Sequence, residues 1–180
     1  MTTLIVSATP GEAAHVPDGL PVVVTGMGKT AAAAALARAL AETPGVTEVV
    51  NIGTAGALRD GLVGLHLPGS VFNHEISGDA LRVLGYDPLE WLEVAGGDET
   101  VLASGDVFVT ETAVRHRLGK VAHLVDMEGY AVAWTCRAFG VPVRLVKHVS
   151  DNADEAATSW PEAVDASARE LGAWVASNVS

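Results

Sequence analysis

The chain has 180 residues, of which 49% are hydrophobic and 18% charged, a composition that excludes a disordered chain and is typical of a folded domain. Its formal net charge of −11 argues against a nucleic-acid partner, because proteins that bind the phosphate backbone need stripes of lysine and arginine. The length predicts a single domain over residues 1–180, large enough to bury a core.

The cysteine count and the hydropathy pattern bear on the compartment. Cys136 is the single cysteine, so an intrachain disulfide is excluded and a reducing compartment is favoured. No apolar run approaches the length of a membrane span, and the first residues lack a basic segment followed by an apolar one. We therefore expect a cytoplasmic protein with no membrane partner.

Strand and helix patterns alternate in the first third of the chain. Each strand-like run is followed by a turn that contains glycine; the first turn carries Glu12, and the third, residues 53–56, contains only small residues. This alternation favours an α/β fold with a largely parallel sheet. The predicted strands are residues 4–8, 21–24 and 46–52, and the predicted helix, rich in alanine, is residues 30–42.

The middle of the chain is less regular. Apolar runs at residues 67–72 and 107–109 predict strands, whereas residues 78–97 hold many glycine, proline and acidic residues and are interpreted as a loop or lid. Residues 161–178 predict an amphipathic helix that packs on the sheet. Its apolar face comprises Val164, Ala168, Leu171 and Val175.

The segment 123–154 predicts a strand, a helix and a second strand, each strand followed by an acidic turn. Glu128 and Asp151 stand in these two turns. Ligands of open α/β sheets bind beyond the carboxyl ends of the strands, so one pocket is expected to hold both carboxylates. Either residue could instead serve only as a helix or turn cap. The predicted strands are residues 123–125 and 143–149, and the predicted helix is residues 129–139.

Two glycine-containing turns invite a phosphate-binding interpretation. Residues 26–30 read GMGKT, but a phosphate loop also needs a glycine five residues before Gly28, where this chain has Val23. A tight strand-to-helix turn is therefore favoured over nucleoside triphosphate hydrolysis. Residues 53–56, GTAG, either allow close packing or form a nest of amides for an anion or a water.

Five short motifs lie along the chain, each weak by itself. They are GMGK at residues 26–29, NIGTAG at 51–56, SGDVF at 104–108, VDME at 125–128 and SDNAD at 150–154. In this order they resemble the purine nucleoside phosphorylase and nucleosidase superfamily, and most closely its methylthioadenosine/S-adenosylhomocysteine nucleosidase branch. The resemblance implies a three-layer α/β domain, with helices flanking a mixed central sheet, that cleaves the bond between a purine and ribose.

The same resemblance gives three acidic residues catalytic roles. Asp151 matches the acid that protonates the purine at N7, and Glu128 matches the group that holds the ribose hydroxyls. Glu12 matches the base or positioning group for an attacking water, assisted by Thr54 and Lys147. These residue types suit the reaction, because the sugar becomes positively charged while the departing base becomes negative.

The implied substrate-binding residues follow from the same matches. Phe108 and Val109 correspond to the base site, the latter partly through its backbone, and Met127 corresponds to a residue under the ribose. Trp160 matches an aromatic residue near base and sugar, although its position alone equally suits core packing. The full set is Met27, Thr54, Phe108, Val109, Met127, Lys147, Ser150 and Trp160.

Water is the expected nucleophile. A phosphate pocket presents arginine forks or comparable donors, but this chain has Asn51 before the glycine turn and Glu12 where a phosphorylase of this superfamily has arginine. A carboxylate there repels phosphate. We therefore predict hydrolysis of methylthioadenosine, S-adenosylhomocysteine or a futalosine-type nucleoside. The histidines show no metal-ligand spacing, and we expect no cofactor.

Two other functions stay open: a phosphate-dependent purine nucleoside phosphorylase and a non-catalytic purine-binding module. The chain departs from the family pattern because it is shorter between about residues 78 and 100, and because Lys147 replaces an arginine and Thr54 a serine. Family members pair or form rings, so the resemblance implies a homo-oligomer, with a dimer favoured.

Overall fold

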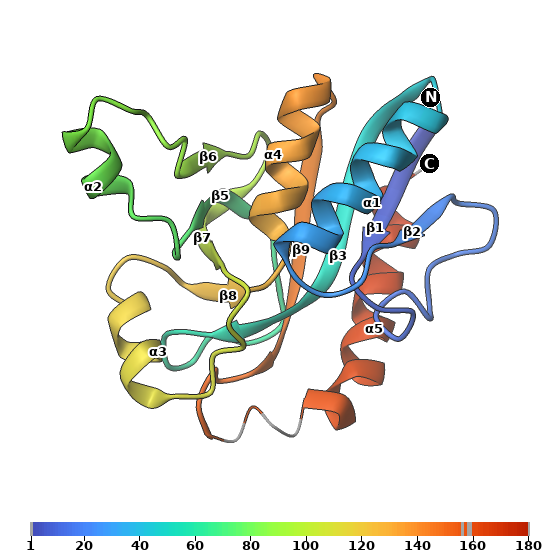
Figure 1. The fold of residues 1–180 in the computed structure, drawn as a ribbon. Coiled ribbons are helices and arrows are strands. Elements are labelled where there is room, and N and C mark those ends of the chain that lie inside the picture. Colours follow the sequence, from blue (N-terminus) through green and yellow to red (C-terminus); the bar gives the residue numbers. More distant parts are fainter. Residues whose placement is uncertain (1, 156, 158–159, 180) are drawn as a thin grey trace.

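A mixed sheet of nine strands runs through the computed structural model, which describes residues 2–155, 157 and 160–179 (Figure 1). The strands are β1 (Thr2–Ser7), β2 (Val22–Val24), β3 (Val46–Ala57), β4 (Leu65–His66), β5 (Pro68–Asn73), β6 (Trp91–Glu93), β7 (Asp98–Ser104), β8 (Leu124–Asp126) and β9 (Val143–Asp151). The helices are α1 (Lys29–Glu42), α2 (Gly78–Val83), α3 (Thr112–Leu118), α4 (Gly129–Phe139) and α5 (Trp160–Asn178).

The long strand β3 is the centre of the sheet. It pairs in parallel with β1 and β9 and antiparallel with β8, and β2 adds to β1 in parallel. Beyond β8 the sheet continues through β7 and β5 in parallel and ends with β6, which is antiparallel to β5. The mixed central sheet implied by the resemblance is thus confirmed.

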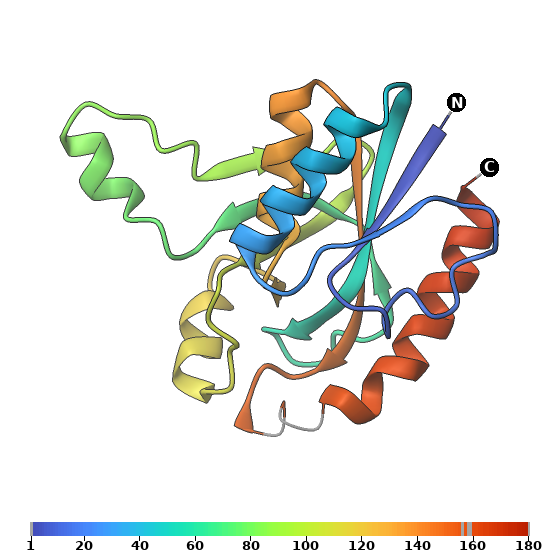
Figure 2. The same ribbon diagram turned by 45° about the vertical axis from the view of Figure 1, so that its right-hand side comes forward.

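Helices cover both faces of this sheet (Figure 2). On one face α1 packs against α4, with Leu36 of α1 in the same core cluster as Val132 of α4. On the other face α5 places Leu171 and Val175 against strand residues such as Ile52. Each fully buried leucine or valine contributes about 1.5–3 kcal/mol, so these two layers supply much of the stability that positions the strand ends.

Residues 53–56 form part of β3, so the predicted turn is wrong. The strand continues because its small residues stay paired with β9, from Gly53 opposite Lys147 to Gly56 opposite Asp151. A Cβ on Gly56 would stand 2.8 Å from the Cβ of Ala153. The small side chains of residues 53–56 therefore leave room for the turn that follows β9, and they do not form a turn of their own.

Residues 107–109 are outside the strands, so that prediction is wrong as well. Strand β7 ends at Ser104, and the amides of Asp106 and Val107 then donate to the carboxylate of Glu75 at 2.8 and 3.1 Å. The Lys29 ammonium forms an ion pair with the same carboxylate. Phe108 lines a cavity and Val109 packs in a core cluster, which explains two of the apolar residues. The backbone just before them is held by the Glu75 side chain instead of a neighbouring strand.

The segment 78–97 contains more regular structure than the predicted loop or lid. Helix α2 and its flanking residues project from the body of the fold, and β6 returns to the sheet edge (Figures 1 and 2). The ring of Trp91 in β6 stacks on Phe72 of β5, with ring centroids 4.2 Å apart. None of the helices in the described part of the chain is long and apolar enough to cross a membrane.

Candidate active site

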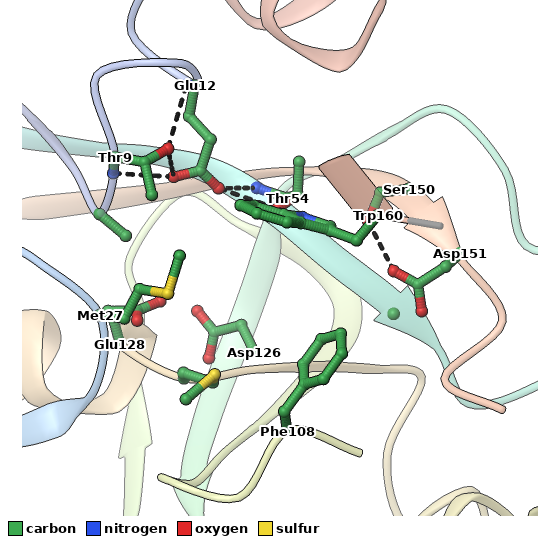
Figure 3. Close-up of a pocket in the computed structure, with 13 residues that line it drawn as sticks. Thr9, Glu12, Met27, Thr54, Phe108, Asp126, Glu128, Ser150, Asp151 and Trp160 are labelled. Atoms are coloured by element: carbon green, nitrogen blue, oxygen red, sulfur yellow. Dashed lines mark hydrogen bonds between the residues drawn. The ribbon is translucent and has the colours of Figure 1, made fainter. Parts of the chain in front are cut away.

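A cavity of about 340 Å³ lies where β1, β8 and β9 end and where β3 passes beside them (Figure 3). Within the described residues, each site residue predicted from the sequence lines this cavity except Val109 and Lys147. The lining residues are Ala8, Thr9, Glu12, Met27, Thr54, Gly56, Phe108, Asp126, Met127, Glu128, Ser150, Asp151 and Trp160.

Glu12 is buried and held by donors on both carboxylate oxygens. The amide and hydroxyl of Thr9 donate to Oε2 at 3.1 and 3.0 Å. The amide and hydroxyl of Thr54 both donate to Oε1 at 2.8 Å. A Cβ on Gly53 would stand 3.3 Å from Oε1, so the glycine allows this close approach to β3. The carboxylate is therefore fixed at the cavity wall before any ligand enters.

Glu128 stands at the N-cap position of α4, but its side chain forms no capping hydrogen bond with that helix. It is buried, and the amide of Gly28 donates to its Oε1 at 2.7 Å. Burial, and then the neighbouring carboxylate of Asp126, raises the pKa of Glu128 to about 7. This carboxylate thus gains or loses its charge near neutral pH.

Asp126 and Lys147 form a buried ion pair behind Glu128. The distance from Lys147 Nζ to Asp126 Oδ2 is 2.9 Å, and the two side chains are only 2% and 1% exposed. Burial by itself lowers the pKa of Lys147, but the carboxylates of Asp126, Glu128 and Glu12 outweigh it and raise that pKa overall. Lys147 therefore lies as a fixed cation beneath the acidic cavity rather than in its wall.

Asp126 lines the cavity although the sequence did not predict it as a site residue. The Ser104 hydroxyl and the Gly129 amide donate to its carboxylate, in addition to the Lys147 ammonium. One signal could have found it: Lys147 lies in the middle of a predicted strand of the sheet, and a buried lysine needs a carboxylate partner. Asp126 stands two residues before Glu128, in the turn already identified as acidic.

Asp151 lies across the cavity at the end of β9. The Ser150 hydroxyl donates to its Oδ2 at 2.7 Å, and the Ala153 amide donates to its Oδ1 at 2.8 Å. The side chain is only partly buried. Its orientation is therefore set by its own turn, while it stays accessible to a ligand in the cavity.

Aromatic and thioether side chains complete the cavity wall (Figure 3). Trp160 lines the cavity, and its indole Nε1 donates to Thr54 Oγ1 at 2.8 Å. Met27 and Phe108 are partly exposed at the same cavity. The side chain of Val109, in contrast, is buried in a core cluster with Phe72, so its predicted contact with a base could come only through its backbone.

The charges of the site favour a ligand that is or becomes positive. Four carboxyl-bearing side chains line the cavity, those of Glu12, Asp126, Glu128 and Asp151. None of the described lining residues is a lysine or an arginine. Hydrogen-bonded carboxylates that are fixed in advance stabilise charge that develops during a reaction, and a carboxyl can also transfer a proton.

Glu128 is expected to make stability depend on pH. Its folded-state pKa of about 7 lies above the ordinary value of 4.5, so the folded chain binds a proton more tightly. The resulting stabilisation is fully present below about pH 4.5 and is lost as pH rises through 7. Glu128→Gln keeps an acceptor for the Gly28 amide but cannot titrate. Its free energy of unfolding in urea should therefore lack this pH-dependent contribution. A stability difference from wild type that is constant between pH 4.5 and 7.5 would contradict the prediction.

Comparison with known proteins gives consistent matches. Residues 5–76 and 98–177 match the family model described as phosphorylase superfamily. Over 165 residues the chain is 31% identical to the 5′-methylthioadenosine/S-adenosylhomocysteine nucleosidase of Shewanella oneidensis, covering 76% of this chain and 69% of that protein. Over 84 residues, 45% of this chain, it is 40% identical to the aminodeoxyfutalosine nucleosidase of Helicobacter pylori strain J99, and this match spans only 36% of that relative.

A solved structure gives a match over nearly the whole chain. It is a mutant of the Helicobacter pylori 5′-methylthioadenosine/S-adenosylhomocysteine nucleosidase with 5′-methylthioadenosine in the active site. The TM-score is 0.85 and the identity 25%, over 98% of this chain and 96% of that chain.

Proposed function

Because this chain belongs to the phosphorylase superfamily, we propose that it is a nucleosidase that hydrolyses the bond between a purine and ribose. One observation carries the proposal: Glu12, Glu128 and Asp151 reach a single cavity from three separate parts of the sequence. Nucleosidases are also the relatives that the chain resembles.

The geometry suggests a role for each carboxyl group. As the bond from the ribose carbon to the purine nitrogen breaks, positive charge develops on the sugar, and anionic Glu128 stabilises it. Asp151 donates its proton to the departing base, which takes the electron pair of the broken bond. Water attacks the ribose carbon, and Glu12 positions this water and accepts its proton. Each group acts from an orientation that is fixed by the hydrogen bonds described above.

Water is favoured over phosphate as the nucleophile. Phosphate recognition relies on charge-assisted donors such as arginine, which the described cavity lining lacks. Lys147 is engaged by Asp126, and Glu12 fills the place beside Thr54 where an anion would need a donor. An incoming phosphate would therefore meet carboxylates.

The 5′ group of the substrate is proposed to be a neutral thioether. Met27, which is left free when Phe108 borders the base and Met127 the ribose, gives the cavity an apolar wall that suits a methylthio group. A carboxylated 5′ group of the futalosine type would add an anion to a cavity that already holds four carboxyl groups, so it is the second candidate.

We also propose that the chain forms homo-oligomers. Helix α2 and the residue after it project from the body of the fold and expose the apolar side chains of Val83 and Leu84.

Release of free base from a nucleoside panel tests the reaction. We expect methylthioadenosine to yield adenine at the same rate with and without phosphate, because water supplies the nucleophile. The panel should include S-adenosylhomocysteine, adenosine and a futalosine-type nucleoside. Strict dependence on phosphate would identify a phosphorylase instead. Thermal stabilisation by nucleosides without any base release would identify a purine-binding module.

A further inference from the structure

Trp160 lines the cavity and also belongs to the hydrogen-bond network that holds Glu12. It is the first residue of α5 and lines the cavity, while its indole Nε1 lies 2.8 Å from Thr54 Oγ1 (Figure 3). An indole N–H can only donate a hydrogen bond. In this contact the threonine hydroxyl must therefore be the acceptor.

That restriction decides where the Thr54 hydroxyl proton lies. The hydroxyl has one proton and two lone pairs, and Trp160 occupies a lone pair without offering an acceptor in return. The hydroxyl oxygen also lies 2.8 Å from Glu12 Oε1, and a carboxylate accepts. The proton is consequently directed to Glu12, giving a chain of donors that runs from Trp160 through Thr54 to Glu12.

We infer that Trp160 is a positioning residue that orients the Glu12 carboxylate through the Thr54 hydroxyl, an inference that rests on the proposed nucleosidase function. Glu12 Oε1 has two donors from Thr54, the amide and the hydroxyl. The amide is fixed by β3, but the hydroxyl is free to rotate unless something holds it. The indole N–H restrains the hydroxyl through its hydrogen bond, and the indole lies in the wall of the cavity that receives the substrate.

Phenylalanine separates this role from packing. Trp160→Phe keeps an aromatic ring at the cavity wall but removes the N–H, so the Thr54 hydroxyl can turn away from Glu12. Thr54→Val removes the hydroxyl with little change of shape. Trp134→Phe is the matched control, because Trp134 lies on α4, 46% exposed, and is outside the set of residues that line this cavity.

The experiment is a double-mutant cycle on base release, measured as kcat. Trp160→Phe should lower kcat by about threefold to tenfold, the effect of one hydrogen bond. In the Thr54→Val background the same change should have no further effect. Trp134→Phe should match wild type.

Two results would overturn the inference. One is an unchanged kcat in Trp160→Phe. The other is an equal loss of kcat with and without the Thr54 hydroxyl, which would show that the ring alone matters. The indole N–H resonance of Trp160, identified by its loss in Trp160→Phe, gives a readout without catalysis and should exchange faster in Thr54→Val. An unchanged exchange rate would likewise overturn it. A wild-type protein that releases no base would contradict the proposed function, and this resonance would still test the contact.

Discussion

Asp151→Asn is expected to lower kcat for base release by about 10²- to 10⁴-fold, the usual contribution of a general acid. The amide keeps the size of the side chain and an oxygen that can accept from the Ala153 amide, but it has no acidic proton for the departing base. The base would then leave with its negative charge unneutralised. The rate of adenine release at saturating methylthioadenosine measures the effect.

The fold should survive this change, because Asp151 is only partly buried and its partners belong to its own turn. Asp165→Asn is the matched control: Asp165 lies exposed on α5, where it pairs with Arg169, and its replacement should leave kcat unchanged. Circular dichroism and thermal unfolding would confirm that both variants are folded. Turnover by Asp151→Asn at the wild-type rate would remove Asp151 from its proposed role.

Elements that bury one regular face could be predicted from the sequence. Helix α4 spans Gly129–Phe139 as predicted, and α5 begins at Trp160, one residue before the expected start, with Leu171 and Val175 buried. Hydrophobic spacing suffices there, since each helix packs one stripe against the sheet. The acidic turns at Glu128 and Asp151 were identifiable for a related reason, because charged residues after apolar runs mark strand ends.

Features that depend on partners distant in sequence could not be predicted in this way. The glycine-rich residues 53–56 lie in a strand because β9 pairs beside them, and the backbone amides of Asp106 and Val107 are held by the side chain of Glu75. Neither partner is visible in the local pattern. Asp126 was overlooked as a site residue for the same reason, because its role depends on a lysine in another strand. Local propensity gives way to tertiary contacts at these positions.

Lys147→Met is expected to destabilise the folded chain by about 3–5 kcal/mol, the cost of removing one partner of a buried ion pair. The Asp126 carboxylate, 1% exposed, would then stay buried next to Glu128 without the ammonium that compensates its charge. Methionine fills most of the space of the lysine stem, so the loss reports charge rather than packing. Urea unfolding at pH 7 measures it.

Two further variants separate the ion pair from other effects of Lys147. Arg169→Met removes a cation from an exposed pair with Asp165 and should change stability by about 1 kcal/mol or less. The double variant Asp126→Asn/Lys147→Met removes both buried charges and should recover a large part of the loss, because no uncompensated ion remains. A Lys147→Met protein within about 1 kcal/mol of wild type would mean that the site tolerates an unpaired Asp126. The ammonium would then be no structural requirement of the acidic cavity, and its remaining effect would be on Glu128, whose pKa Lys147 lowers.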